Sequence, residues 1–285
     1  MSRNKDRLGN SKPEGDSLPP QALQQNTSPG FSFVVPTEFV ELPSGGKYYP
    51  EGHPLHGEDS LEIKQMTAKE EDMLTSRTLL KKGVALDRVI ESLILNPQIS
   101  ADDLLVGDKN AIIISTRVAG YGSEYTTQVN CPSCAATQEY TFDLNEANIY
   151  TGENAHKLGL VDNNDGTFTT TLPRAQVAVT FRLLTGRDEK RMVAHLENAR
   201  KRKKPEQAVT LQLHCMIVDA GGDNSPEAIK YLIDNIPSMD SRHLRLAYNL
   251  AAPNVDLTQH FECAECSHEQ EMEVPLTADF FWPDR

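Results

Sequence analysis

Gln128-Val-Asn-Cys-Pro-Ser-Cys134 and His260-Phe-Glu-Cys-Ala-Glu-Cys266 are two stretches that each carry a Cys-x-x-Cys motif. A turn of this kind places two sulfurs on one side of a tight loop, where both can reach one zinc ion at about 2.3 Å. Two such turns supply four thiolates, which fill a tetrahedral site and leave no position open for water. The motifs therefore predict a structural Zn²⁺ site formed by Cys131, Cys134, Cys263 and Cys266.

The sequence on both sides of each motif favours hairpin strands. Residues 124–130 and 137–144 flank the first motif, and residues 257–262 and 269–276 flank the second. These runs are short, contain β-branched or aromatic residues, and roughly alternate in polarity, which is typical of half-buried strands. Each cysteine pair is therefore expected at the tip of a β-hairpin.

Other uses of the cysteines are less favoured. Neither pair opens a helix after a buried strand, as a redox dithiol would. The polar N-terminus shows no secretory signal, so a reducing compartment is expected, where disulfides are disfavoured. Two separate half-sites, or a ligand supplied by His260 or His268, remain open alternatives. Cys215, in an apolar run with helical spacing, is interpreted as a buried core thiol.

The chain also contains the pattern of two diverged copies. The two cysteine motifs are offset by 132 residues, and other features recur in the same order. They are a Leu-Pro pair, a Thr-led capping box and an aspartate that opens a helix: Leu42-Pro43, Thr67 with Glu70 and Asp108 in the first copy, and Leu172-Pro173, Thr185 with Asp188 and Asp240 in the second. A pair of related modules would bring one cysteine knuckle from each to the same ion.

These patterns predict an α+β fold in which two diverged copies of a strand–helices–zinc-knuckle-hairpin module meet at a shared, zinc-ribbon-like four-cysteine site. The expected parts are a disordered N-terminal arm (1–30), a first module (31–145), a linker (146–166), a second module (167–276) and an aromatic C-terminal tail (277–285). Within the second module, one helix is expected to run from near Pro205 to just before Gly221.

Composition limits the function classes. The chain has 285 residues, 38% of them hydrophobic, and a formal net charge of −13, which opposes non-specific binding to nucleic acid. The basic run at residues 200–204 is interpreted as a solvated helix end, with a patch that docks an acidic partner as the alternative. The sequence has no apolar stretch of about 18 residues, so no membrane span is expected.

Catalytic patterns are missing from the sequence. We find no Ser-His-Asp order, nucleophile elbow or His-Glu-x-x-His motif, and Tyr48 follows Lys47 where a phosphate loop requires Ser or Thr. The chain is therefore predicted not to be an enzyme. Near its end, Phe280, Phe281 and Trp282 form an aromatic cluster. We expect it to fold back onto the second module or, alternatively, to anchor another subunit.

The order of elements resembles a known family. Leu42-Pro-Ser-Gly-Gly46, the Thr-led acidic helix at 67–74, Gly107-Asp108-Lys109 and the two cysteine knuckles are similar to the baseplate-hub assembly proteins of contractile-tailed, T-even-type bacteriophages. The resemblance implies a non-enzymatic late protein of virion assembly, with baseplate hub and tape-measure proteins as partners. It also implies zinc ligation by the four cysteines, and a location in the host cytoplasm during assembly or in the tail baseplate of the virion.

Three rival functions follow from the same features. A zinc-ribbon nucleic-acid-binding or transcription-related protein should carry Lys and Arg around its knuckles, whereas these flanks carry glutamates such as Glu139, Glu262 and Glu271. A hydrolase with a catalytic zinc needs an open ligand position, which four thiolates deny. The Leu-Pro start followed by a Thr-led helix is similar to tail-assembly chaperones, whose client is the tape-measure protein.

Overall fold

A computed structural model describes residues 25–28, 31–81, 83–275 and 278–281. The chain divides into two compact units, one that ends at Thr37 and one that begins at Glu38. In the first unit, β1 (Gln25–Ser28) pairs antiparallel with β2 (Phe31–Val34). A strand therefore lies inside the segment for which the sequence predicts disorder, and the rest of that arm, 1–24 and 29–30, lies outside the described residues.

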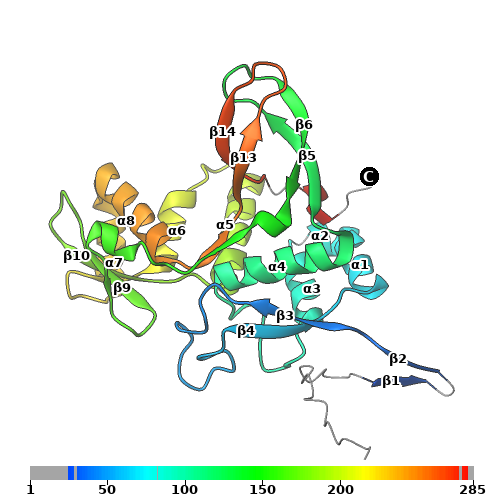
Figure 1. Ribbon diagram of the computed structural model, residues 1–285. Helices are drawn as coiled ribbons and strands as arrows, with labels where there is room; N and C mark the ends of the chain where they lie inside the picture. The colour runs from blue at the N-terminus through cyan, green and yellow to red at the C-terminus, as the bar shows by residue number, and fades with distance from the viewer. Residues whose placement is uncertain (1–24, 29–30, 82, 276–277, 282–285) are drawn as a thin grey trace, which may run out of the picture. The chain divides into compact units, whose positions relative to one another are not determined.

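The first half of the second unit leads from a strand pair through helices to a hairpin (Figure 1). The paired strands are β3 (Thr37–Glu41) and β4 (Ser60–Lys64). The helices are α1 (Ala68–Thr75), α2 (Arg77–Lys81), α3 (Ala85–Leu93) and the longer α4 (Val106–Tyr121). The hairpin consists of β5 (Glu124–Asn130) and β6 (Thr137–Asp143).

The second half again combines strands, helices and a terminal hairpin. An antiparallel sheet has the order β11-β10-β9-β8, formed by Ile217–Ala220, Ala178–Arg182, Thr167–Thr171 and Val161–Asp162. The helices are α5 (Gly186–Lys201), α6 (Ala208–Met216), α7 (Pro226–Asn235) and α8 (Ser238–Ala251). The hairpin consists of β13 (Thr258–Glu262) and β14 (Glu269–Glu273).

Smaller elements connect the halves. β7 (Asn148–Tyr150) pairs antiparallel with β12 (Asn254–Asp256), so part of the predicted linker forms a strand. Short 3₁₀ turns η1 (Leu144–Glu146), η2 (Ala155–Leu158) and η3 (Ala278–Phe281) complete the described chain. One cluster of buried apolar side chains, which includes Ile112 and Phe181, continues through both halves. The fold is therefore mixed α+β, as predicted, with a core common to both halves.

Local sequence signals explain where several helices begin. Glu70 and Asp188 both occupy the third helical position, where each accepts the backbone N–H of its capping threonine, Thr67 or Thr185, at 3.0 Å. These reciprocal contacts satisfy N–H groups that a helix start would otherwise leave unpaired. Both predicted capping boxes are confirmed. In the described part of the chain, no helix is long and apolar enough to cross a bilayer.

One predicted helix is shorter than expected. The helix expected from Pro205 to Gly221 begins at Ala208 and ends at Met216, after which Ile217–Ala220 form the edge strand β11. The β-branched residues Ile217 and Val218 favour a strand, and β11 gains backbone hydrogen bonds by pairing with β10. Pairing with a strand remote in sequence therefore decides the conformation of these residues.

The C-terminal aromatic residues Phe280 and Phe281 fold back onto the protein and contact its first half. Phe280 and Phe281 are buried, and Arg117 Nε of α4 donates a hydrogen bond to the Phe280 carbonyl at 2.6 Å. The Phe280 ring also lies edge-on against Tyr125 of β5, with 5.2 Å between centroids. Both contacts are with the first half, and Phe280 and Phe281 also line a pocket together with Leu257 and Glu273 of the second module. Packing on the second module therefore stays a prediction. Trp282 lies outside the described residues.

Candidate metal centre

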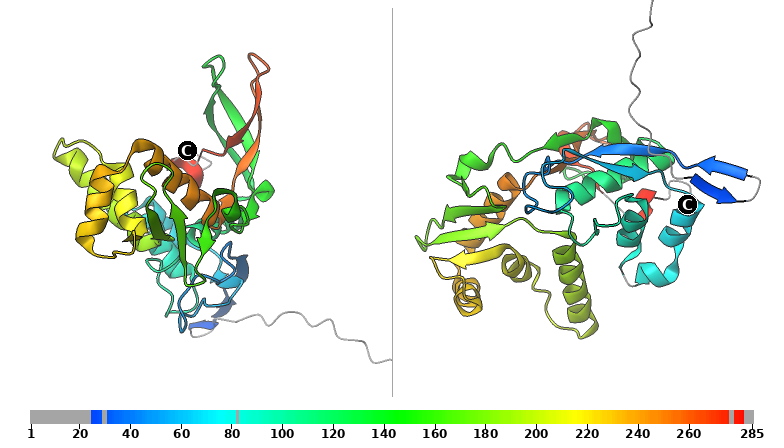
Figure 2. Two further views of the ribbon diagram at one scale, coloured as in Figure 1. Left: turned by 90° about the vertical axis from the view of Figure 1, so that its left-hand side faces the viewer. Right: turned by 90° about the horizontal axis from the view of Figure 1, so that it is seen from below.

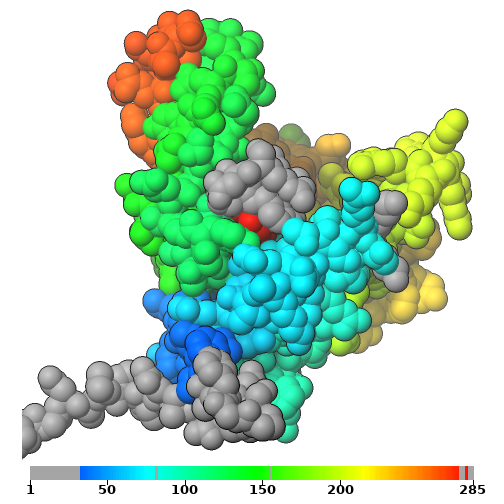
Figure 3. All heavy atoms as spheres, turned by 90° about the vertical axis from the view of Figure 1, so that its right-hand side faces the viewer, coloured from blue at the N-terminus to red at the C-terminus, as the bar shows by residue number. Residues whose placement is uncertain are grey.

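The two hairpins that carry the cysteines lie side by side. Figures 1 and 2 show β5–β6 and β13–β14 adjacent and standing away from the helices, and Figure 3 shows them above the segment that holds α1 to α3. Each Cys-x-x-Cys motif forms the turn of its hairpin, because Cys131 follows β5 directly and Cys263 follows β13 directly. The tips of the hairpins therefore bring together motifs that are remote in sequence.

The two turns have the same backbone geometry. In the first, Cys131 N–H donates to the Ala136 carbonyl at 2.8 Å and Ala135 N–H donates to the Cys131 carbonyl at 2.9 Å. In the second, Cys263 pairs with His268 and Ser267 in the same way, both at 2.9 Å. Ala135 and Ser267 have φ values of 57° and 51°, in the left-handed region that L-residues rarely adopt. Each turn therefore contains one residue in a strained backbone conformation. Each turn also places its two sulfurs on the side that faces the other turn.

The four sulfurs form one compact cluster. Their Sγ atoms all lie within 4.8 Å of one another, and the pairs Cys131–Cys266 and Cys134–Cys263 are each 3.7 Å apart. A tetrahedron with metal–sulfur bonds of about 2.3 Å has edges of about 3.8 Å. The spacing and the all-sulfur donor set therefore fit a single tetrahedral metal ion. Cys131 and Cys263 are buried, whereas Cys134 and Cys266 are exposed.

Thiols this close influence one another's ionisation. The backbone N–H of Cys134, with a smaller contribution from Ser133, lowers the pKa of the Cys131 thiol to about 6. The backbone N–H of His268 acts in the same direction on Cys266. There, however, the neighbouring thiols outweigh it and raise the pKa of Cys266 to about 12. Four thiolates cannot share this space without a compensating cation, and a bound divalent metal would supply it.

Contacts between side chains and backbone hold the hairpins together. Gln138 of β6 donates to the Glu262 carbonyl at 3.1 Å and accepts the Ala264 N–H at 2.9 Å. Tyr140 donates to the His260 carbonyl at 3.1 Å. Gln259 exchanges hydrogen bonds with the backbone of Asp143. These bonds fix the position of one hairpin against the other. The four sulfurs are therefore held together by the folded hairpins.

The structure distinguishes the sequence alternatives. Among the described residues, the cluster consists of the four predicted cysteines and includes neither His260 nor His268. The imidazole of His260 instead lies 3.9 Å from the Glu271 carboxylate. Cys215 is buried in α6, away from the cluster, as predicted. Sequence reasoning missed the linking glutamines Gln138 and Gln259. Their only sequence signal was their place in strands beside the knuckles.

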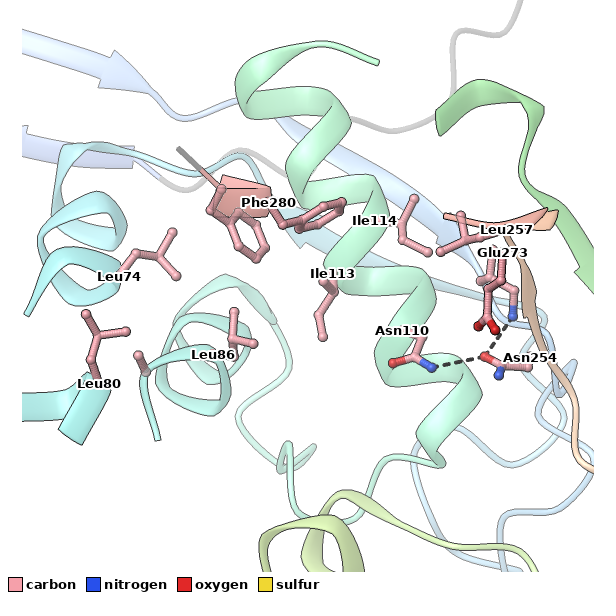
Figure 4. Close-up of a pocket in the computed structure, with 13 residues that line it drawn as sticks. Leu74, Leu80, Leu86, Asn110, Ile113, Ile114, Asn254, Leu257, Glu273 and Phe280 are labelled. Atoms are coloured by element: carbon pink, nitrogen blue, oxygen red, sulfur yellow. Dashed lines mark hydrogen bonds between the residues drawn. The ribbon is translucent and has the colours of Figure 1, made fainter. Parts of the chain in front are cut away.

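A second candidate site is an apolar pocket of about 330 Å³ between the helices and the C-terminal segment (Figure 4). Its walls include Leu74, Leu86, Ile113 and Phe280. Its polar side chains are Glu273 and an amide pair in which Asn110 Nδ2 donates to Asn254 Oδ1 at 3.1 Å. Such a lining suits the packing of an apolar group, and it offers no nucleophile beside a base.

Comparison with protein families gives a match over most of the chain. The model of the family described as "T4 bacteriophage base plate protein" matches residues 35–282. That span includes both cysteine knuckles and nearly all of the second unit. No match was found among curated proteins or among solved structures.

Proposed function

The chain belongs to the T4 bacteriophage base plate protein family, and on this premise we propose that it acts in assembly of the baseplate hub through protein–protein contacts, without catalysis. The family match over residues 35–282 is the observation that carries the proposal, because it covers almost the whole folded chain. A structural protein of the phage baseplate belongs to the tail of the virion. The finer role in the hub is supported by the resemblance of the motif order.

Co-expression tests this role. The chain should form a complex with the hub proteins of its own phage, or increase their solubility. The same experiment with the tape-measure protein examines the rival role as a tail-assembly chaperone, which predicts binding to that client alone. No complex and no change in solubility with either set of proteins would refute a role in assembly.

We also propose that the four-cysteine cluster binds one structural Zn²⁺. The proposal is supported by the 3.7 Å sulfur separations and by the softness of four thiolates, which select zinc among common divalent ions. The four ligands would fill the coordination sphere, so the ion would stabilise the paired hairpins and would not activate water. Cys131, Cys134, Cys263 and Cys266 would hold it.

Metal analysis tests the zinc site directly. Mass spectrometry should find about one zinc per chain in the wild type and none in a Cys131→Ser, Cys263→Ser double variant. The Cys215→Ser variant is the matched control, because this thiol is buried outside the cluster, and it should retain the metal. Zinc in the double variant, or no metal in the wild type, would contradict the proposal.

Finally, we propose that modules 31–145 and 167–276, joined by residues 146–166, descend from one duplicated unit. Matched contacts support this. The first-turn aspartate of α4, Asp108, accepts hydrogen bonds from the segment after Leu42-Pro43. Asp240, in the first turn of α8, accepts the backbone N–H groups of Arg174 and Ala175 after Leu172-Pro173, both at 2.8 Å. The two knuckle turns also share the same pattern of backbone hydrogen bonds. They are offset by 132 residues, as Asp108 and Asp240 are.

A further inference from the structure

Five consecutive cations span the end of helix α5 and the turn after it: Arg200, Lys201, Arg202, Lys203 and Lys204, here called the basic strip. All five residues of the strip are exposed, on a chain whose net charge is −13. Two of its members are paired nearby: Arg200 with Glu206 at 3.1 Å and Lys201 with Glu197 at 3.4 Å. In the described part of the chain, the other three form no ion pair. Positive charge is therefore concentrated, and partly uncompensated, on an acidic protein.

The backbone of the strip adds a second observation. Lys204 N–H donates to the Ala199 carbonyl and Lys203 N–H donates to the Arg200 carbonyl, the hydrogen bonds of a Schellman turn. Lys203 occupies the left-handed position of that turn, with φ of 54°. Glycine is the usual residue at this position, and any other residue lowers the stability of the folded protein by about 1 kcal/mol. The helix dipole favours Arg200 and Lys201 in the last turn, but it does not explain a lysine in this strained place.

The strip borders a hollow that is lined by hydrogen-bond donors. A pocket of about 430 Å³ lies between the end of α5 and the start of α6, and α5 projects from the rest of the second unit in the right-hand view of Figure 2. The polar side chains that line this pocket are His195, Asn198, Arg202, Lys204 and Gln207. All of them can donate a hydrogen bond, and none is a carboxylate. Such a lining is complementary to anionic oxygen atoms.

We propose that the basic strip and its pocket form a docking surface for an acidic segment of another protein chain. Several donors around one hollow can donate hydrogen bonds to carboxylates spaced along a peptide, with Arg202 and Lys204 as the principal contacts. A long nucleic acid fits less well, because the acidic remainder of the surface would repel its extended phosphate backbone. The surface lies at the end of α5 and in the segment between α5 and α6, and this proposal does not depend on zinc or on the hub assignment.

Fluorescence anisotropy with a labelled peptide of alternating Glu and Ala tests the proposal on the full chain. The wild type should bind the peptide saturably, and affinity should fall as salt is added. The Arg202→Gln, Lys204→Gln variant should lose roughly tenfold in affinity. The control variant, Lys69→Gln with Arg77→Gln, makes the same charge change at two exposed positions on α1 and α2. It should bind like the wild type.

A third variant separates binding from folding. Lys203→Gly removes the strained residue, so it should keep or raise the unfolding temperature while it weakens peptide binding. Equal losses in the strip and control variants would show that only net charge matters and would overturn the proposal. Tighter binding to a DNA duplex of equal charge would also overturn it in favour of a nucleic-acid surface, as would the absence of saturable peptide binding.

Discussion

The carboxylate of Asp108 accepts both the backbone N–H and the hydroxyl of Ser44, at 3.0 and 2.6 Å, although 64 residues separate the two. It also accepts the Tyr49 hydroxyl at 2.7 Å. Asp108 is fully buried, and that burial raises its pKa despite the hydrogen bonds from Ser44 and Tyr49. One carboxylate in the first turn of α4 therefore fixes the loop between β3 and β4.

Replacing Asp108 with Ala should destabilise the protein by about 2–5 kcal/mol, because three buried donors lose their acceptor. Urea denaturation measures this loss. Asp72→Ala, at an exposed position on α1, is the control and should change stability by less than about 0.5 kcal/mol. Asp240→Ala should behave like Asp108→Ala if the two modules are equivalent. A neutral effect at Asp240 would count against the duplication.

The stability of α1 should depend on pH through Glu70. Burial raises the pKa of this carboxyl, but hydrogen bonds from Ser92, Thr67 and Lys64 together outweigh it and lower the pKa to about 2. A depressed carboxyl pKa stabilises the fold above the unfolded value of about 4.5. That contribution, up to about 3 kcal/mol, is lost as the pH falls from about 4.5 towards 2.

The Glu70→Gln variant tests this dependence. At neutral pH it should be less stable than the wild type, and the difference should shrink as the solution is acidified, because the wild type then loses its ionised carboxylate. Urea midpoints of both proteins at a series of pH values measure the difference. A constant difference across the acid range would show that Glu70 acts by packing alone.

Lys109 links three helices through a buried cluster of charges. Its ammonium lies 2.7 Å from Asp87 of α3 and 3.0 Å from Glu189 of α5. Lys109→Met should lower the free energy of unfolding by about 3–5 kcal/mol, because it leaves the carboxylates of Asp87 and Glu189 without their cation. Lys230→Met, which removes an exposed pair with Asp234 on α7, should cost less than about 1 kcal/mol. Similar losses in both variants would mean that the buried cluster adds nothing specific.

Local patterns allowed prediction of a large part of the fold and of the site. The capping residues Thr67 and Thr185 marked helix starts, and the spacing of Cys131 and Cys263 with their partners marked the cluster, because both signals lie within a few neighbouring residues. Strand β11 and the packing of Phe280 on Tyr125 were not predictable in this way. Their conformations are set by partners far away in the sequence, for which a single chain carries no local signal.

The start of α4 approaches the backbone before β12 closely. Gly107 lies in the first turn of α4, where an added Cβ would lie 2.0 Å from the Pro253 carbonyl oxygen. Gly107→Ala must therefore move the backbone before β12, at an expected cost of about 1–3 kcal/mol. Gly120→Ala, in the same helix, meets only the flexible end of Met66, at 2.9 Å. It should be neutral or stabilising by up to about 1 kcal/mol, because alanine favours helix. Thermal unfolding of the two variants separates these effects, and equal melting temperatures would show that α4 and the Pro253 segment are not in contact.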